Sequence, residues 1–451
     1  MKKVWSFGLV LLCLIIVSAC GSSNNNGSDA TGQPAATPQG SASPTDSGDA
    51  APEQPFAGQK LTLYLSNTNW GSAIEQLLPA FEAETGINVE MESFAEKQLT
   101  EKVSIQFTTG SSSPDVYMFR PPNEGKLFYA NGWMEPLGPY IEKVPDFDLA
   151  DFSDVALSQV TYDEQVAGIP GIANTQIIYY RKDLLENAGL AVPTTLDELA
   201  AAIQKLHDPK NEIYGFIARG GQTELVGQTS SFLFSEGGDF TQDGQAAINT
   251  PAAMKAFTMY GSLLRDYGPP GILNMAFPQA VALFAQGKGA FLTDASGMFV
   301  NFNSADKSPV WDKIGYAQFP AGSVGSKPFY VTSWALAMNP RSENKDAGWE
   351  LIRWLTTKEG ITKAQELGTL GARKSVWESP DGTKAFPEDL AKAVQHATVN
   401  GVNHNLPEVT NVAEAREAVG SIVVKIILGE DGQEEADKQN AALQKIIDSE
   451  Q

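Results

Sequence analysis

Alternating and periodic apolar positions in the first third of the chain predict strands and helices that follow one another in turn. Strands are predicted at 61–65 (LTLYL), 88–94 and 115–119, and helices at 72–86 and 99–109. Ser72 and Glu75 have capping-box spacing, and Gly86 is a typical helix end. Pro79 inside this helix predicts a kink or a later start. Strands that alternate with helices indicate an α/β fold with a mainly parallel, doubly wound sheet.

The same alternation continues through the rest of the chain. Further strands are predicted at 175–180, 214–218, 290–293 and 314–319, and helices at 195–206, 346–355, 361–367 and 434–447. Thr195 and Glu198 again form a capping-box pattern. Two α/β lobes account for these two series of elements.

The N-terminus has the pattern of a secretory signal peptide, predicted to be residues 1–19. Lys2 and Lys3 precede an apolar run from 7 to 17, and small residues lead to Cys20. The alternative is a transmembrane anchor, but spanning a bilayer takes roughly 20 apolar residues. The string VSACG at 17–21 resembles a bacterial lipobox, which implies cleavage before Cys20 and a lipid on its sulfur. We therefore expect an extracytoplasmic protein anchored to the outer face of the cell membrane.

Composition separates this end from the folded body. Residues 20–57 contain the lipidated cysteine and a stretch rich in Ser, Gly, Asn and Pro, which is typical of a disordered tether. A flexible coil of this length spans roughly 30–35 Å. Cys13 and Cys20 are the chain's two cysteines, so the mature body would have neither a disulfide nor a catalytic thiol.

The chain is strongly acidic, with 54 Asp and Glu against 32 Lys and Arg and a formal net charge of −22. No basic block interrupts this distribution. Such a protein repels nucleic acid and anionic membrane surfaces, so we expect no nucleic-acid partner.

Separated segments of the chain resemble the extracellular solute-binding protein family 1, whose members serve ABC importers of sugars and include the maltodextrin-binding proteins. The segments are FEAETGINV (81–89), GSSSPDV (110–116), ANGWMEPL (130–137), GIP (168–170), IYYRKDL (178–184), AGL (188–190), PTTLDEL (193–199), FAQGKGAF (284–291) and AGWELIRWL (347–355). Their order and spacing extend over almost the whole mature chain. The resemblance implies a non-catalytic receptor that captures a carbohydrate and delivers it to a membrane permease.

The resemblance also implies the two-lobe periplasmic-binding-protein-like fold, with three hinge crossings that close on ligand. We place the crossings near 170–174, 330–334 and 368–373, where Gly and Pro punctuate the sequence. Lobe 1 would then comprise 58–170 plus 335–368, and lobe 2 would comprise 171–334 plus 369–451. We expect the receptor to act as a monomer.

Ligand contacts are expected outside the carboxyl ends of the strands and at the crossings. A sugar needs hydrogen-bond donors and acceptors for its hydroxyls and flat aromatic surfaces for its CH faces. The candidates are Asn69, Trp70 and Arg120 in lobe 1, Arg219, Gln222 and Asp294 in lobe 2, and Asn174, Ser333, Trp334 and Arg373 at the crossings. For Trp70 the alternative is packing in the core, and for the charged residues it is a surface salt bridge or a cap.

Two other functions stay open. A receptor for a polyol, glycerol phosphate or another non-sugar solute would use the same arginines, and an anchored glycoside hydrolase or lyase needs only two carboxylates. His207, His396 and His404 form no HExxH motif, and neither a GxSxG nor a phosphate-loop motif is present. We expect no cofactor and no metal. The pair Tyr179 and Tyr180 lies in an apolar strand and is predicted to be core.

Overall fold

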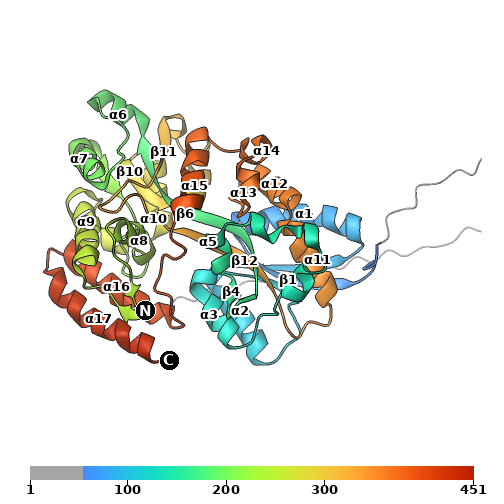
Figure 1. The fold of residues 1–451 in the computed structure, drawn as a ribbon. Helices are drawn as coiled ribbons and strands as arrows, with labels where there is room; N and C mark the ends of the chain where they lie inside the picture. The colour runs from blue at the N-terminus through green and yellow to red at the C-terminus, as the bar shows by residue number, and fades with distance from the viewer. Residues whose placement is uncertain (1–53, 451) are drawn as a thin grey trace, which may run out of the picture. The chain divides into compact units, whose positions relative to one another are not determined.

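An eight-stranded sheet runs through the part of the chain that the computed structural model describes, residues 54–450 (Figure 1). Its strands are β1 (Lys60–Ser66), β2 (Asn88–Phe94), β3 (Val116–Phe119), β6 (Ile169–Arg181), β7 (Tyr214–Ile217), β10 (Gly289–Ala295), β11 (Ile314–Gln318) and β12 (Tyr330–Met338). The order is β2-β1-β3-β12-β6-β10-β7, and β11 also pairs with β6. Two hairpins lie apart, β4 (Thr161–Tyr162) with β5 (Gln165–Val166), and β8 (Thr241–Gln242) with β9 (Gln245–Ala246).

The first half of the body is built on β1, β2 and β3, which are parallel as predicted. Its helices include α1 (Asn69–Thr85), α2 (Glu96–Thr108), α3 (Lys126–Ala130), α4 (Gly138–Ile141), α5 (Asp154–Ser158), α11 (Lys345–Thr356) and α12 (Lys358–Glu366). Helix α1 begins before the predicted Ser72, because the Thr68 hydroxyl caps it by accepting a hydrogen bond from the Gly71 N–H. Its predicted end is confirmed, with Gly86 in the left-handed conformation at φ 75°.

The second half is built on β7, β10, β11 and the end of β6, and its sheet is mixed: β10 is parallel to β7 but antiparallel to β6. Its helices include α6 (Lys182–Ala188), α7 (Leu196–Leu206), α8 (Val226–Ser235), α9 (Pro251–Tyr267), α10 (Phe277–Ala285), α15 (Glu388–Asn400), α16 (Val412–Ile427) and α17 (Gly432–Asp448). The predicted capping box of α7 is confirmed, since Thr195 and Glu198 bond each other's backbone. Tyr179 is fully buried, as predicted for a core residue.

Two long strands connect the halves. The first part of β6 pairs with β12, and its last part pairs with β10 and β11. The sequence pattern predicts this strand only from Thr175, because Pro170 and Gly171 mark a turn in most contexts. Pairing with Trp334, Ala335 and Leu336 of β12 extends it back to Ile169.

A third segment returns the chain to the second half later than the predicted crossing at 368–373. Helices α13 (Lys374–Trp377) and α14 (Pro380–Thr383) pack on α12, whereas α15 packs on β11 (Figure 1). Residues 369–383 therefore lie with the first half, although the sequence analysis assigns them to lobe 2. The physical reason is Arg373, whose side chain is buried among carbonyl groups of the first half.

The predicted signal peptide, Cys20 and most of the tether lie outside the described residues. Within residues 54–450, no helix combines the length and apolar character that crossing a membrane requires.

Candidate functional site

A cavity of about 460 Å³ lies where β6 and β12 pass from one half to the other. Its charged lining residues are Glu96, Arg120, Arg219, Glu224 and Arg416. Its polar lining residues include Asn123, Asn174, Gln228, Ser333 and Asn405, and its apolar ones include Phe277, Met298, Phe329, Val331, Trp334 and Leu406. Both halves contribute, so a molecule held here contacts the two of them at once.

Five of the residues proposed from the sequence line this cavity: Arg120, Asn174, Arg219, Ser333 and Trp334. Asp294 is completely buried directly behind Arg219. Asn69 lies in a neighbouring open cavity of about 740 Å³, which shares Phe277 and Pro278 with the first.

Arg219 and Asp294 form a bidentate ion pair on the side of the cavity that belongs to the second half. Arg219 Nε and Nη2 donate to the two carboxylate oxygens at 3.0 and 2.7 Å, and the Tyr260 hydroxyl donates to the Arg219 carbonyl at 2.7 Å. Burial alone lowers the pKa of Arg219, but Asp294 and Glu224 outweigh it and raise that pKa. The guanidinium also lies 5.4 Å from the centre of the Phe277 ring. This arginine is held rigidly and stays charged.

Arg120 occupies the matching position in the first half, directly after β3. Its backbone N–H donates to Glu124 at 2.8 Å, its Nε donates to the same carboxylate at 2.9 Å, and its Nη1 donates to Glu96 at 3.0 Å. The guanidinium lies 5.7 Å from the centre of the Trp334 ring. Burial lowers the pKa of Arg120, but Glu124 and Glu96 outweigh this effect and raise it.

Arg416, on α16, is the third cavity arginine and is not among the candidates predicted from the sequence. Its Nε donates to the Thr223 carbonyl at 2.9 Å, and Glu224 lies 4.0 Å away. Its pKa is lowered, chiefly by burial and also by the charges of Arg219 and Arg120, although Glu224 acts in the opposite direction. The local sequence offers no signal for this residue, since it lies in the middle of a helix that reaches the cavity only through tertiary packing.

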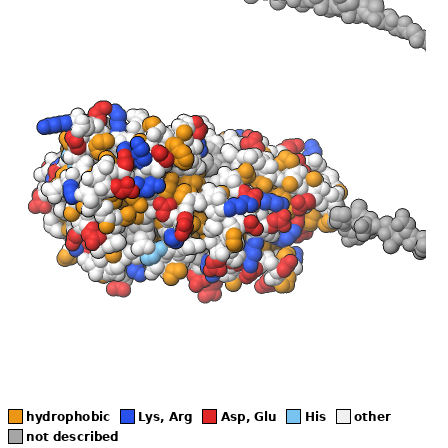
Figure 2. Space-filling view, turned by 90° about the horizontal axis from the view of Figure 1, so that it is seen from above, with side chains coloured by type: hydrophobic (Ala, Val, Ile, Leu, Met, Phe, Trp, Pro, Cys, Tyr) orange, Lys and Arg blue, Asp and Glu red, His pale blue; other side chains and the backbone are white. Residues whose placement is uncertain are grey.

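The three arginines are matched by acids. Arg120 pairs with Glu124 and Glu96, Arg219 with Asp294, and Glu224 lies within 4.0 Å of both Arg219 and Arg416. These three cations, Arg120, Arg219 and Arg416, therefore have four acidic partners, of which Glu96 and Glu224 line the cavity and Glu124 and Asp294 lie behind it. On the face of the body seen in Figure 2, acidic and basic side chains are also interspersed.

Asn174 and Ser333 join the strands that connect the halves. Asn174 Nδ2 donates to Ser333 Oγ at 2.9 Å, and Asn174 Oδ1 accepts from the Gly297 N–H at 2.8 Å. The β6–β12 pairing shifts register between Thr332 and Trp334, so Ser333 has no strand partner there. Such irregularities turn side chains out of the regular strand pattern, and here Ser333 and Trp334 both line the cavity.

Two carboxamide oxygens of the lining lack a hydrogen-bond donor among the described residues. They are Gln228 Oε1, on a side chain that is 3% exposed, and Asn405 Oδ1. Buried polar atoms are normally bonded, so these two oxygens are unsatisfied acceptors beside the cavity.

Three sequence candidates have other roles in the structure. Trp70 is 1% exposed and packs on Gly171, where an added Cβ would lie 1.9 Å from the indole ring, so the core alternative describes it. Arg373 is also 1% exposed and donates to carbonyl oxygens of the first half. Gln222 donates to the Glu417 carboxylate at 2.7 Å on the surface of α16. Residue type and position along the chain therefore do not distinguish these three residues from the residues that line the cavity.

Residues 65–362 match the model of the bacterial extracellular solute-binding protein family. A mannitol-binding protein of Pseudomonas aeruginosa is 30% identical over 339 residues, which are 72% of this chain and 74% of that protein. One similar structure is an ABC transporter solute-binding protein of Agrobacterium radiobacter K84, solved with ribitol. It is 27% identical to this chain with a TM-score of 0.75, and the match covers 86% of this chain and 99% of that protein's chain. A second structure, the solute-binding protein of Agrobacterium vitis S4 with D-mannitol, is 25% identical with a TM-score of 0.68. The match covers 87% of this chain and 98% of that protein's chain.

Proposed function

Because the chain belongs to the bacterial extracellular solute-binding protein family, it is a non-catalytic receptor of an ABC transporter, and we propose that its ligand is a small neutral polyol, with sugars as the second candidate class. The expected family membership and receptor function are confirmed. The observation that carries the ligand proposal is the charge pairing of the cavity. Each arginine there already has a carboxylate within 4.0 Å.

Charge pairing favours a neutral ligand for a simple reason. An anion such as glycerol phosphate would be drawn to guanidinium groups with free charge, but it would be repelled by Glu96 and Glu224, which line the same cavity. A neutral molecule with hydroxyl groups leaves the existing ion pairs intact. Its hydroxyls can accept hydrogen bonds from Arg120 and Arg219.

The relatives support a polyol in particular. The proteins named above are described as binding mannitol or ribitol, and they are between 25 and 30% identical to this chain. A cavity of about 460 Å³ also falls within the size range of small-molecule sites.

We also propose that the two halves act as lobes that close on the ligand. Asn174, Ser333 and Trp334 lie both at the connecting strands and in the cavity, which supports coupling between ligand and hinge. We assign 58–170 and 335–383 to the first lobe and 171–334 and 384–451 to the second. Small-angle scattering with and without ligand tests this proposal, because closure reduces the radius of gyration.

Calorimetric titration with a panel of compounds tests the ligand proposal. The panel contains D-mannitol, ribitol and erythritol as polyols, maltose and glucose as sugars, and glycerol 3-phosphate as an anion. We expect binding of at least one polyol, weaker or no binding of the sugars, and none of the anion. Tight binding of glycerol 3-phosphate alone would contradict the neutral-ligand argument. A parallel assay for released products addresses the hydrolase alternative, and we expect no turnover.

We further propose that Cys20 carries the lipid that anchors the receptor. The apolar run at 7–17 and the string VSACG support this assignment. Cells supplied with an alkyne-tagged fatty acid should label the wild-type protein, and the Cys20→Ser variant should remain unlabelled and leave the membrane fraction. Equal labelling of the variant would exclude Cys20 as the attachment site, and two acyl chains would be needed for stable anchoring.

A further inference from the structure

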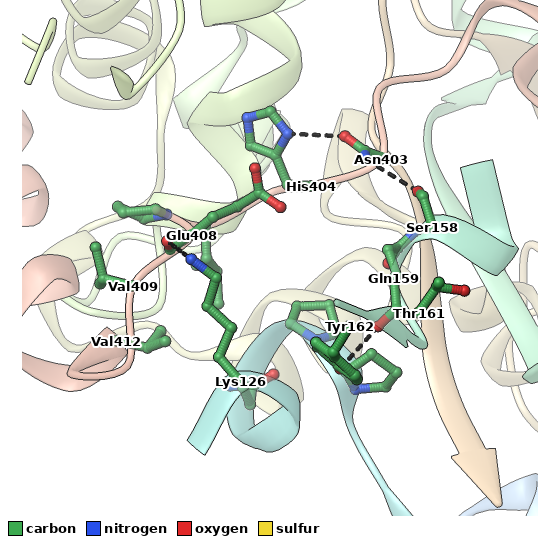
Figure 3. Close-up of a pocket in the computed structure, with 15 residues that line it drawn as sticks. Lys126, Ser158, Gln159, Thr161, Tyr162, Asn403, His404, Glu408, Val409 and Val412 are labelled. Carbon is green, nitrogen blue, oxygen red and sulfur yellow. Dashed lines mark hydrogen bonds between the residues drawn. The ribbon is translucent and has the colours of Figure 1, made fainter. Parts of the chain in front are cut away.

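The segment 401–411, which we call the strap, connects α15 to α16 and passes along the cavity. It is fixed to the start of β12, since Val402 N donates to the Pro328 carbonyl at 2.9 Å and Tyr330 N donates to the Val402 carbonyl at 2.8 Å. Asn405 and Leu406 then line the solute cavity. A smaller cavity of about 140 Å³ shares Leu406 of the strap with the solute cavity, and part of its wall belongs to the first half (Figure 3).

A chain of hydrogen bonds runs through the strap from one half to the other. His404 Nε2 lies 2.8 Å from Asp239 Oδ1 of the second half, and His404 Nδ1 lies 3.1 Å from Asn403 Oδ1. Asn403 Nδ2 then donates to the Ser158 hydroxyl, at the end of α5 in the first half, at 3.0 Å. Figure 3 shows the last two bonds as dashed lines, together with the bond from Lys126 to the Glu408 carbonyl.

The partners of His404 determine its protonation state. Both ring nitrogens face oxygen atoms, a carboxylate oxygen on Asp239 and the amide oxygen of Asn403. Asn403 is oriented by its own donation to Ser158, so its oxygen is the atom left to face the ring. A neutral imidazole has one N–H, and only the imidazolium form has the two donors that this arrangement uses.

The surroundings of His404 favour the same form. The titratable groups that face it are Asp239 from the turn after α8, Glu408 from the strap, and Lys126 and Tyr162 across the small cavity. Two aromatic rings also lie beside it, Phe234 at 4.9 Å and Phe240 at 6.2 Å between centroids. Burial lowers the pKa of His404, but the hydrogen bond and charge of Asp239, with the charge of Glu408, outweigh burial and raise it.

We propose that the His404 imidazolium is a positioning residue of the solute site, which holds the strap against Ser158 so that Asn405 and Leu406 form one wall of the cavity. This proposal rests on the proposed function, because it concerns the regulation of the same site. When the pH rises through the folded-state pKa of His404, the ring loses one N–H. The bond to the carboxylate of Asp239 is the stronger one, so the bond to Asn403 is lost. The bond that orients Asn403 toward Ser158 is therefore present at low pH and lost as the pH rises, and this loosens the contact between the strap and Ser158.

The first test needs no ligand. The full chain, labelled with ¹³C at the histidine ring, is titrated from pH 5 to 9 by NMR, and the signals of its three histidines are assigned by single substitutions. We expect His404 to titrate at a higher pH than His396, whose pKa is lowered by burial and by Lys327. Hydrogen exchange of residues 401–411, corrected for its intrinsic pH dependence, should accelerate over the same pH range. A neutral His404 throughout the titration would overturn the proposal.

The second test uses D-mannitol as the probe. The dissociation constant of the wild-type protein should rise about fivefold as the pH passes the His404 transition, the effect of losing one ordinary hydrogen bond. His404→Gln should bind weakly at every pH with a flat profile, and the control His396→Gln should retain the wild-type profile. An unchanged profile in His404→Gln would overturn the proposal.

Two further arms keep the outcomes distinct. If His404→Gln does not fold, Asp239→Asn replaces it, and the His404 transition should then move to lower pH because the carboxylate is gone. If D-mannitol does not bind to the wild-type protein, the polyol proposal fails, while the NMR titration and hydrogen exchange still decide the protonation and the strap contact.

Discussion

Replacing Arg219 by methionine is expected to weaken D-mannitol binding by between about 10- and 100-fold, because the variant loses charge-assisted hydrogen bonds to the ligand. It also leaves Asp294, which is completely buried, without its cation. An unpaired buried carboxylate is costly, so the free energy of unfolding should fall as well. Calorimetric titration and urea unfolding measure the two effects separately.

A double variant and a control distinguish the two roles of this arginine. In Arg219→Met/Asp294→Asn no buried charge is left unpaired, so most of the lost stability should return while the affinity stays low. Arg181→Met removes another buried arginine, whose Nη2 lies 2.7 Å from the partly exposed Asp183 and which does not line the cavity. It should lose stability but keep wild-type affinity. Equal affinity in Arg219→Met and the wild type would remove Arg219 from the site.

Replacing Arg373 by methionine is expected to lower the free energy of unfolding by about 3–5 kcal/mol, the cost of breaking a buried ion pair. Its guanidinium donates to the carbonyls of Thr356 at 2.6 Å and Phe147 at 2.7 Å, and to Asp151 at 3.2 Å. It also lies 4.3 Å from the centre of the Phe152 ring. Methionine fills part of the volume but leaves these acceptors without a donor.

An exposed arginine provides the control for this variant. Arg265 is 40% exposed and pairs with its neighbour Asp266, so Arg265→Met should change the unfolding free energy by less than about 1 kcal/mol. Folded Arg373→Met should still bind the ligand, because Arg373 does not line the cavity. Wild-type stability of Arg373→Met in urea would contradict the structural role, and loss of binding without loss of stability would return Arg373 to the site.

The ends of several helices could be predicted closely because local patterns decide them. Thr195 and Glu198 cap α7 through contacts within four residues, and Gly86 ends α1 through its own backbone conformation. The start of β6 depends instead on pairing with β12, which is distant in sequence. Tertiary pairing overrides the local turn preference of Pro170 and Gly171.

The site could be predicted only in part for the same reason. Arg219 follows β7 and Asp294 lies near the end of β10. Both are therefore predicted by the tendency of ligands to bind at the carboxyl ends of strands. Trp70 and Arg373 satisfy similar rules, yet both are buried in the core. Arg416 and Asn405 lie on a helix and on the strap near the C-terminus, and only the folded chain brings them to the cavity. Residue type and order along the chain do not contain that information.

The cavity arginines are paired with carboxylates before a ligand binds, and this pairing affects ligand release. A receptor that holds a neutral solute between Arg120 and Arg219 leaves, after release, two cations that are still neutralised by Glu124 and Asp294. Emptying the cavity therefore separates no opposite charges and requires no counterion from solution. Release to a transporter then requires the two halves to open and water to fill the cavity. The receptor returns to its ligand-free state without breaking or forming an ion pair.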